Sequence, residues 1–293
     1  MNTRRQIAEA VYSVCDKSGW LRALGPASRT ANVLMYHRVN DYDHDGLTTP
    51  TPVFEHMMQE LTKRYQLVSL AELVHTVASR SALGNKVAIT FDDGYRDNIE
   101  CAAPILKKYD IPATFFVTTG FIGTTKVFPW DLRNPVANPL MTWDEVRNLA
   151  QMGFEIGAHT ISHPDLGATS SDDARREIRD SKQHVESELG RKIEAFAFPF
   201  GKRESCPIEV SQIVRDAGYS CCCLGYGGKV GPDSELFRLN RIPMYPTTVD
   251  LLMEIDCFLT YFDGFTRFAG IPILRHNVNE GLLGIVWVNP HDS

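Results

Sequence analysis

The sequence contains no long run of basic residues and no long apolar stretch, and these absences exclude several classes of protein. The chain has 293 residues and a net charge of −6, so the phosphate-neutralising surface of a nucleic-acid-binding protein is missing. No segment reaches the about 18 apolar residues of a transmembrane helix, and residues 1–20 lack the uninterrupted apolar core of a signal peptide. We therefore expect no nucleic-acid partner, no membrane span and no cleaved signal.

The cysteines do not form a pattern typical of a disulfide framework. There are seven of them, an odd number, and three are adjacent at 221–223. Reduced thiols fit this set better than the paired cysteines of a secreted protein. Together with the lack of a signal peptide, this indicates a cytoplasmic location.

Apolar runs and amphipathic segments alternate along the chain, which has 43% hydrophobic residues, enough to bury one large core. Strands are expected at 32–37, 65–70, 86–91, 112–117, 154–159, 194–200 and 219–225. Helices are expected at 52–64, 71–79, 97–108, 143–152, 172–189 and 207–217. This alternation predicts the α/β class, with a parallel sheet wrapped by helices. Several strands are apolar throughout, as a sheet buried on both faces requires.

Both ends of the chain depart from this rhythm. Residues 1–31 form an N-terminal helical extension, in which Ile7, Val11 and Val14 have helical spacing after two arginines. We expect this helix to pack on the protein, and peripheral contact with a membrane surface is the alternative. Residues 32–249 are the expected catalytic domain. Residues 250–293 give no assignable pattern and are expected to pack on the same domain.

Polar side chains gather where predicted strands end. In an α/β barrel the loops after the strand carboxyl ends converge, so residues far apart in the sequence meet there. Two imidazoles and a carboxylate are a ligand set that leaves a zinc-like ion open positions for water. The strand ends carry Asp92 with Asp93, His159 with His163 four residues on, Pro199-Phe200-Gly201, and His37. Asp93, His159 and His163 are therefore candidate metal ligands.

Each of these patterns also has an ordinary structural explanation. An Asp-Asp-Gly after a strand is equally typical of a turn with a helix cap, and two histidines four residues apart occur by chance on helix surfaces. Here Pro164 follows His163 directly and a strand precedes His159, so the pair is expected on a loop. A helical HExxH protease motif is absent from the sequence.

Three motifs together carry a resemblance to a known family. TFDDG (90–94), HTISH (159–163) and FAFPFG (196–201) resemble the first three motifs of the polysaccharide deacetylases, carbohydrate esterase family 4. The similarity covers roughly residues 32–245. It implies a NodB-like fold, a distorted (β/α)7 barrel, and a metal-dependent enzyme that removes acetyl groups from N-acetylated saccharides such as those of exopolysaccharides.

The resemblance gives the motif residues chemical roles. Asp93 and the two histidines would hold a divalent ion that polarises the acetyl carbonyl and acidifies a water. Asp92 would be the general base, and the backbone N–H of Phe200 would stabilise the oxyanion. The ligand set favours zinc, and nickel and cobalt also suit imidazole and carboxylate.

The general acid is the point at which the sequence departs from the common family pattern. Most members carry a C-terminal Leu-x-His, which His276 in IPILRHN would match. In a permuted branch, that of the biofilm-polysaccharide deacetylases, the acid histidine instead ends an early strand, as His37 does in LMYH. We favour His37 because its strand is clear. The third motif also lacks the usual arginine, which Arg241 or Arg238 would have to replace.

Three further points stay open at this stage. Trp130 and Asp131 are candidates for lining a sugar cleft, and a buried core tryptophan is an equal alternative. A lipid-linked or small N-acetyl sugar could replace the polymer as substrate. A non-catalytic sugar-binding protein and a hydrolase of non-sugar amides are the remaining alternatives on the same fold.

Overall fold

The computed structural model describes residues 3–18, 30–133 and 136–258. The contacts divide the chain into two units, Pro26–Thr248, and Met1–Gly25 with Val249–Ser293. The domain boundaries expected from the sequence, and the packing of the C-terminal segment on the catalytic domain, stay predictions.

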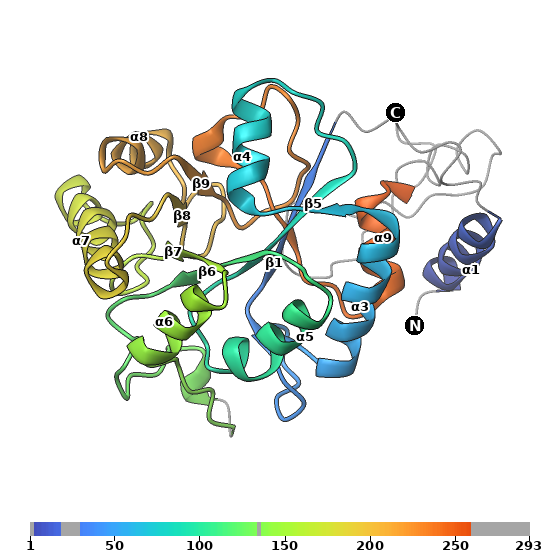
Figure 1. Ribbon diagram of the computed structural model, residues 1–293, viewed down its shortest axis with the longest axis horizontal. Coiled ribbons are helices and arrows are strands. Elements are labelled where there is room, and N and C mark those ends of the chain that lie inside the picture. Colours follow the sequence, from blue (N-terminus) through green and yellow to red (C-terminus); the bar gives the residue numbers. More distant parts are fainter. Residues whose placement is uncertain (1–2, 19–29, 134–135, 259–293) are drawn as a thin grey trace, which may run out of the picture. The chain divides into compact units, whose positions relative to one another are not determined.

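The unit Pro26–Thr248 is built on a parallel sheet that curls into a half-barrel, with helices around its outside (Figure 1). The strand order is β10-β1-β5-β6-β7-β8-β9, and β4 pairs with the start of β5. The strands are β1 Asn32–Tyr36, β4 Gln66–Leu67, β5 Lys86–Phe91, β6 Ala113–Val117, β7 Glu155–Ala158, β8 Ala195–Ala197, β9 Cys221–Cys223 and β10 Ile242–Pro243. A separate pair is formed by β2 Arg38–Val39 and β3 Thr48–Thr49. The predicted α/β class and barrel-like fold are confirmed.

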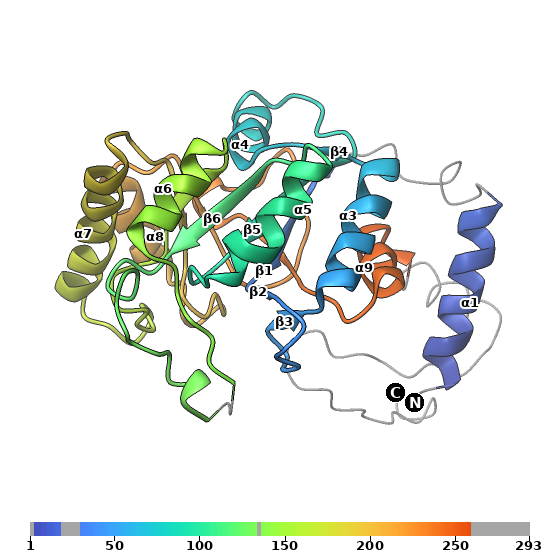
Figure 2. The ribbon, with the colours of Figure 1, turned by 60° about the horizontal axis from the view of Figure 1, so that its bottom comes forward.

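The helices follow the strands in sequence and cover the sheet. They are α3 Thr51–Arg64, α4 Leu70–Ala78, α5 Ala103–Lys108, α6 Trp143–Gln151, α7 Ser171–Leu189 and α8 Ile208–Asp216. Short helical turns are η1 Asn98–Ala102, η2 Asp131–Arg133 and η3 Leu236–Arg238. Helices α3 and α5 lie side by side against β1 and β5 (Figure 2). There Gln59 of α3 donates a hydrogen bond to the Tyr109 hydroxyl at the end of α5.

Helix starts follow local capping chemistry. The Ser69 hydroxyl accepts from the Glu72 N–H, and Thr142 forms a capping box with Glu145. Because the Ser69 cap starts α4 at Leu70, the strand predicted over 65–70 shrinks to the two residues of β4.

The helix predicted over 97–108 begins as a π-helical turn instead of an α-helix. The Ala103 N–H bonds to the Asn98 carbonyl, five residues back, and α5 follows. Pro104 supplies a physical reason, because it has no N–H to continue the regular bonding pattern.

The segment after η3 contacts both ends of the strand order. Leu239 pairs with Cys223 beside β9, and Ile242 of β10 pairs with Leu34 of β1. Arg241 lies between these two pairings and is fully buried. The sequence alone assigned no role to this bridge, since its strand has only two residues.

The second unit contains α1 Thr3–Lys17 and most of α9 Thr248–Ile255, a helix in a stretch for which the sequence gave no assignment. The Tyr12 hydroxyl donates to Asp256, and its ring meets Phe258 edge-on at 5.1 Å. On α1, the side chains of Ile7, Val11 and Val14 are exposed. No helix in the described ranges is both long and apolar enough to cross a membrane.

Candidate metal centre and its surroundings

The parallel sheet brings the polar strand ends together. Tyr36 of β1 is paired with Phe91 of β5, and the Asp92 N–H donates to the Tyr36 carbonyl at 3.0 Å. His37 and Asp92 directly follow these two neighbouring strands, so both lie at the same edge of the sheet. His159 leaves β7 at that edge too, with its N–H bonded to the Val117 carbonyl at the end of β6.

Asp93, His159 and His163 form a compact group of potential metal ligands. The Asp93 Oδ1 atom lies 3.4 Å from Nε2 of His159 and 3.3 Å from Nε2 of His163. The potential ligand atoms all lie within 4.8 Å of one another, and the three side chains are buried. Asp93 Oδ1 accepts no hydrogen bond from any residue that the structure describes. A buried carboxylate oxygen without a donor, facing two imidazole nitrogens, fits a divalent cation.

The hydrogen bond of His159 fixes its tautomer. The His159 Nδ1–H donates to the Ala197 carbonyl at 2.8 Å, so a neutral ring presents the Nε2 lone pair toward Asp93. Burial lowers the pKa of His159, but the charges of Asp92 and Asp93 outweigh it, and the net pKa is raised. The site therefore attracts positive charge, which is the behaviour expected of a cation site.

The pKa of Asp93 is shifted in the opposite direction to that of His159. Burial acts to raise the pKa of this carboxyl, but the imidazoles of His159 and His163 hold it well below its usual range. Asp93 is consequently ionised whenever the protein is folded near neutral pH, as a metal ligand must be.

A carboxylate from α7 holds the loop that carries the two histidines. Both Thr160 and His163 have positive φ angles, 68° and 58°, which are costly for residues with a side chain. Glu177 Oε2 accepts from the N–H groups of Ile161 at 2.8 Å and Ser162 at 2.9 Å, and its Oε1 accepts from the Ser162 hydroxyl. No sequence motif pointed to Glu177, because its helix begins well after the loop.

Asp92 has a different partner from its neighbour Asp93. The buried guanidinium of Arg241 donates to both carboxylate oxygens of Asp92, at 2.7 and 2.6 Å. The same side chain also donates to the Leu224 carbonyl and the Thr90 hydroxyl. Burial alone would raise the pKa of Asp92, but Arg241 and His159 reverse the direction and lower it. Of the two arginines suggested by the sequence, Arg241 occupies this place, whereas Arg238 bonds to Cys206 and Ser211.

The charges of Asp92 and Asp93 both act on the pKa of His37. Burial lowers its pKa, and the opposing effects of Asp93 and Asp92 do not compensate. Its Nδ1 atom has no hydrogen-bond partner within the described residues, and its carbonyl accepts from Asn98. The alternative acid His276 lies outside the described residues.

Phe200 is held in a strained turn beside the metal ligands. Its φ is 60°, and the flanking Gly201 N–H bonds to the Pro199 carbonyl at 2.6 Å. A side chain at Gly201 would overlap the backbone of Gly225, so only glycine fits there. The Phe200 ring is 49% exposed and lies 4.8 Å from the His163 ring. Its N–H has no acceptor in the described parts of the chain and is available to a ligand.

Trp130 and Asp131, both candidates for a sugar cleft, have separate environments. The Trp130 ring meets the rings of His163 at 5.0 Å and Phe200 at 6.2 Å. The Asp131 side chain does not line a cleft, because it is buried and paired with Arg38.

Comparison with known proteins shows similarity to polysaccharide deacetylases. The family model described as polysaccharide deacetylase matches residues 80–222. YxkH of Bacillus subtilis, whose name assigns it to the polysaccharide deacetylases, is 28% identical over 233 residues, which are 79% of this chain and 76% of that protein. The poly-β-1,6-N-acetyl-D-glucosamine N-deacetylase of Staphylococcus epidermidis is 27% identical over 188 residues, 61% of this chain and 59% of that one.

A solved structure agrees with these matches. The Streptococcus pyogenes deacetylase PplD, determined in complex with acetate, is similar with a TM-score of 0.66 and 27% identity, over 77% of this chain and 98% of that one. The family resemblance carried by the three sequence motifs is thereby confirmed.

Proposed function

Because residues 80–222 form a polysaccharide deacetylase domain, we propose that the protein hydrolyses the acetamide of N-acetylated sugars, in a poly- or oligosaccharide of the N-acetylglucosamine type. One observation carries the proposal. The two adjacent aspartates have different partners: a buried arginine binds Asp92, whereas Asp93 faces two imidazoles. This separation suits one carboxylate to proton transfer and the other to holding a cation.

Asp93, His159 and His163 would hold the divalent metal, and their imidazole and carboxylate donors favour zinc over harder ions. A metal bound there supplies a Lewis acid for the acetyl carbonyl and lowers the pKa of a water. The hydrogen bond from His159 to Ala197, and those of Glu177 to the following loop, keep the ligands oriented before the metal arrives.

Asp92 takes the proton of the attacking water as general base. Arg241 keeps this carboxylate ionised and fixes both of its oxygens, so its proton-accepting form is present at neutral pH. The Phe200 N–H donates to the acetyl oxygen as negative charge develops on it.

His37 donates a proton to the leaving amine. Burial lowers the pKa of His37, whereas the charges of Asp93 and Asp92 favour the imidazolium form that this step needs. The register of β1 with β5 supports this role, because it puts His37 next to Asp92 at the strand ends.

A lipid-linked N-acetyl sugar is a second candidate substrate. The exposed side chains of Ile7, Val11 and Val14 lie four and three residues apart on α1, a spacing that gives one apolar face suited to peripheral contact with a membrane. We keep the polysaccharide as the first candidate substrate, because an apolar face on α1 gives no information about which sugar is bound.

The test is acetate release from N-acetylglucosamine oligomers of increasing length. Metal-loaded wild-type protein is compared with Asp92→Asn protein of equal metal content and with chelator-treated protein. We expect release that rises with chain length and falls at least about 100-fold in the variant. Release independent of length would favour the small or lipid-linked sugar. No release from fully metallated wild-type protein would reject N-acetylglucosamine oligomers as substrates and favour a lipid-linked sugar, a non-sugar amide or a binding role.

A further inference from the structure

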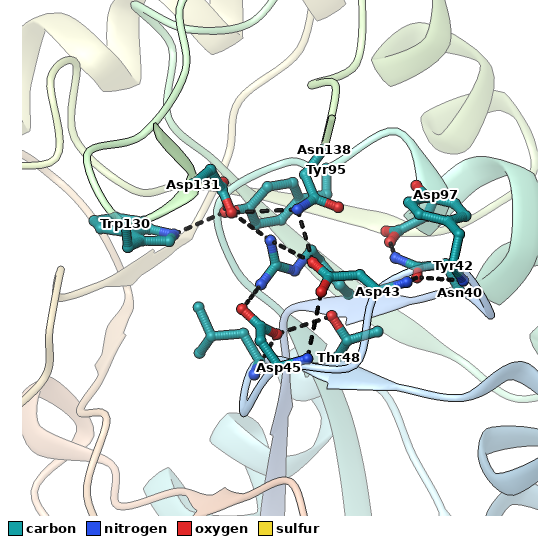
Figure 3. Close-up of polar contacts among 12 residues, drawn as sticks. Asn40, Tyr42, Asp43, Asp45, Thr48, Tyr95, Asp97, Trp130, Asp131 and Asn138 are labelled. Carbon is teal, nitrogen blue, oxygen red and sulfur yellow. Dashed lines mark hydrogen bonds and ion pairs between the residues drawn. The ribbon is translucent and has the colours of Figure 1, made fainter. Parts of the chain in front are cut away.

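Arg38, the residue after the acid candidate His37, is fully buried among three carboxylates. Its Nη1 atom lies 2.5 Å from Asp131 Oδ1 and 3.4 Å from Asp43 Oδ2, and its Nη2 atom pairs with Asp45. Figure 3 shows these aspartates converging from two loops, one leading from β2 to β3 and one after β6. The ion pairs therefore join β2, the strand directly after His37, to the loop that carries Trp130.

A chain of hydrogen bonds leads from this cluster to Trp130 (Figure 3). The Tyr95 hydroxyl donates to Asp131 Oδ2 at 2.7 Å and accepts from the Trp130 indole N–H at 2.9 Å. Tyr95 and Asp131 are buried, and Tyr95 directly follows the TFDDG motif. The bonds from the Trp130 indole through the Tyr95 hydroxyl to Asp131 form a continuous path, and linked hydrogen bonds of this kind restrict the groups that they join.

The indole at the end of this chain reaches the metal ligands. Trp130 stacks on Phe128, with ring centroids 4.6 Å apart, and meets His163 edge-on at 5.0 Å. It is half-buried, so part of the ring is open to a ligand. Phe128–Trp130 belong to no helix or strand, and the indole is held by its bond to the Tyr95 hydroxyl and its stacking on Phe128.

We propose that Tyr95 and Asp131, anchored by Arg38, are positioning residues that hold Trp130 as a wall for the saccharide beside the metal centre. The inference rests on the proposed function and adds a residue set that determines substrate binding. When the indole is already fixed, saccharide binding does not have to order that side chain. Loss of the hydrogen bonds that hold Trp130 should therefore weaken saccharide binding more than it slows the chemical step.

A double-mutant cycle with Tyr95→Phe and Trp130→Ala tests the inference. The phenylalanine removes the bridging hydroxyl and creates no unpaired charge, which makes this variant safer to fold than one of Arg38. We expect KM for the oligosaccharide to rise about tenfold, with kcat changed less than about threefold and metal content unchanged. In the Trp130→Ala background, the same substitution should alter KM by less than about twofold, because the residue through which Tyr95 acts is gone.

Tyr219→Phe is the matched control. Its buried hydroxyl donates to the Ile178 carbonyl, away from Trp130, and its loss should leave KM unchanged. The inference is overturned if Tyr95→Phe leaves KM unchanged, or if it raises KM by the same factor whether or not Trp130 is present.

A substrate-independent readout separates this inference from the proposed function. Failure of the wild-type protein to release acetate would reject only the deacetylase assignment. The fluorescence of Trp130, taken as the difference between wild type and Trp130→Phe, still reports on how firmly Tyr95 and Asp131 hold the indole. We expect Tyr95→Phe to increase its quenching by acrylamide, and equal quenching would overturn the inference.

Discussion

Replacement of Arg241 by methionine gives the sharpest test of the site. The change leaves the Asp92 carboxylate buried and removes the two hydrogen bonds that its oxygens accept. Removal of one partner from a buried ion pair costs about 3–5 kcal/mol of folding free energy, because the remaining charge is uncompensated. With a urea m-value of about 3 kcal/mol per molar, the unfolding midpoint should fall by roughly 1 M or more.

The same substitution should also change the pH dependence. In the wild type the pKa of Asp92 is lowered, so its stabilising effect is present above the unfolded pKa and is lost as the pH falls through the folded value. Without Arg241, burial dominates and the pKa of Asp92 rises. The acid limb of the kcat/KM profile should therefore move to higher pH.

The assay is urea unfolding of metal-loaded protein, with Arg238→Met as the matched control. Arg238 lies three residues away and donates to the Cys206 carbonyl and Ser211 instead of Asp92. The double variant Arg241→Met with Asp92→Asn should recover much of the lost stability, because the uncompensated charge is gone. Equal midpoints for Arg241→Met and Arg238→Met, or no recovery in the double variant, would refute the reasoning.

Three other predictions concern the acid, the histidine loop and a buried carboxyl. His37→Ala should lower kcat at least about 100-fold with unchanged metal content, whereas His276→Ala should do little; the opposite pattern would reverse the assignment. Glu177→Gln should weaken metal affinity about tenfold by competition titration, whereas Asp180→Asn on the same helix should have no effect. Burial raises the pKa of Asp97 to about 7. The free energy of unfolding should therefore fall by about 4 kcal/mol as the pH rises from about 4 to 7. Asp97→Asn should flatten that slope, and an unchanged slope would contradict the shift.

The α/β order and the metal ligand candidates were predictable because both depend on local patterns. Fully apolar runs such as 112–117 predict strands buried on both faces, and β6 is fully buried. Asp93 and His159 stand out because they come just after strands, with His163 four residues on, and parallel strands bring their carboxyl ends to one edge.

Local reasoning was less successful where partners come from distant segments. Arg241 was one of two equal guesses, since nothing in RLNRIP shows which guanidinium reaches Asp92. Asp131 was one candidate for lining a sugar cleft, but the buried charge of Arg38 holds it inward. The start of the helix after TFDDG also differed, because the bonding pattern there depends on Pro104.

The sequence by itself determined which side chains can do chemistry, because strand ends and motif spacing are encoded within a few residues. Only the tertiary structure decided how those groups are tuned. Arg241 charges and orients Asp92, Glu177 stabilises a strained loop, and Tyr95 links Trp130 to Arg38. Each of these contacts joins residues distant in the chain, and electrostatic and hydrogen-bond energies depend on separation in space and on burial.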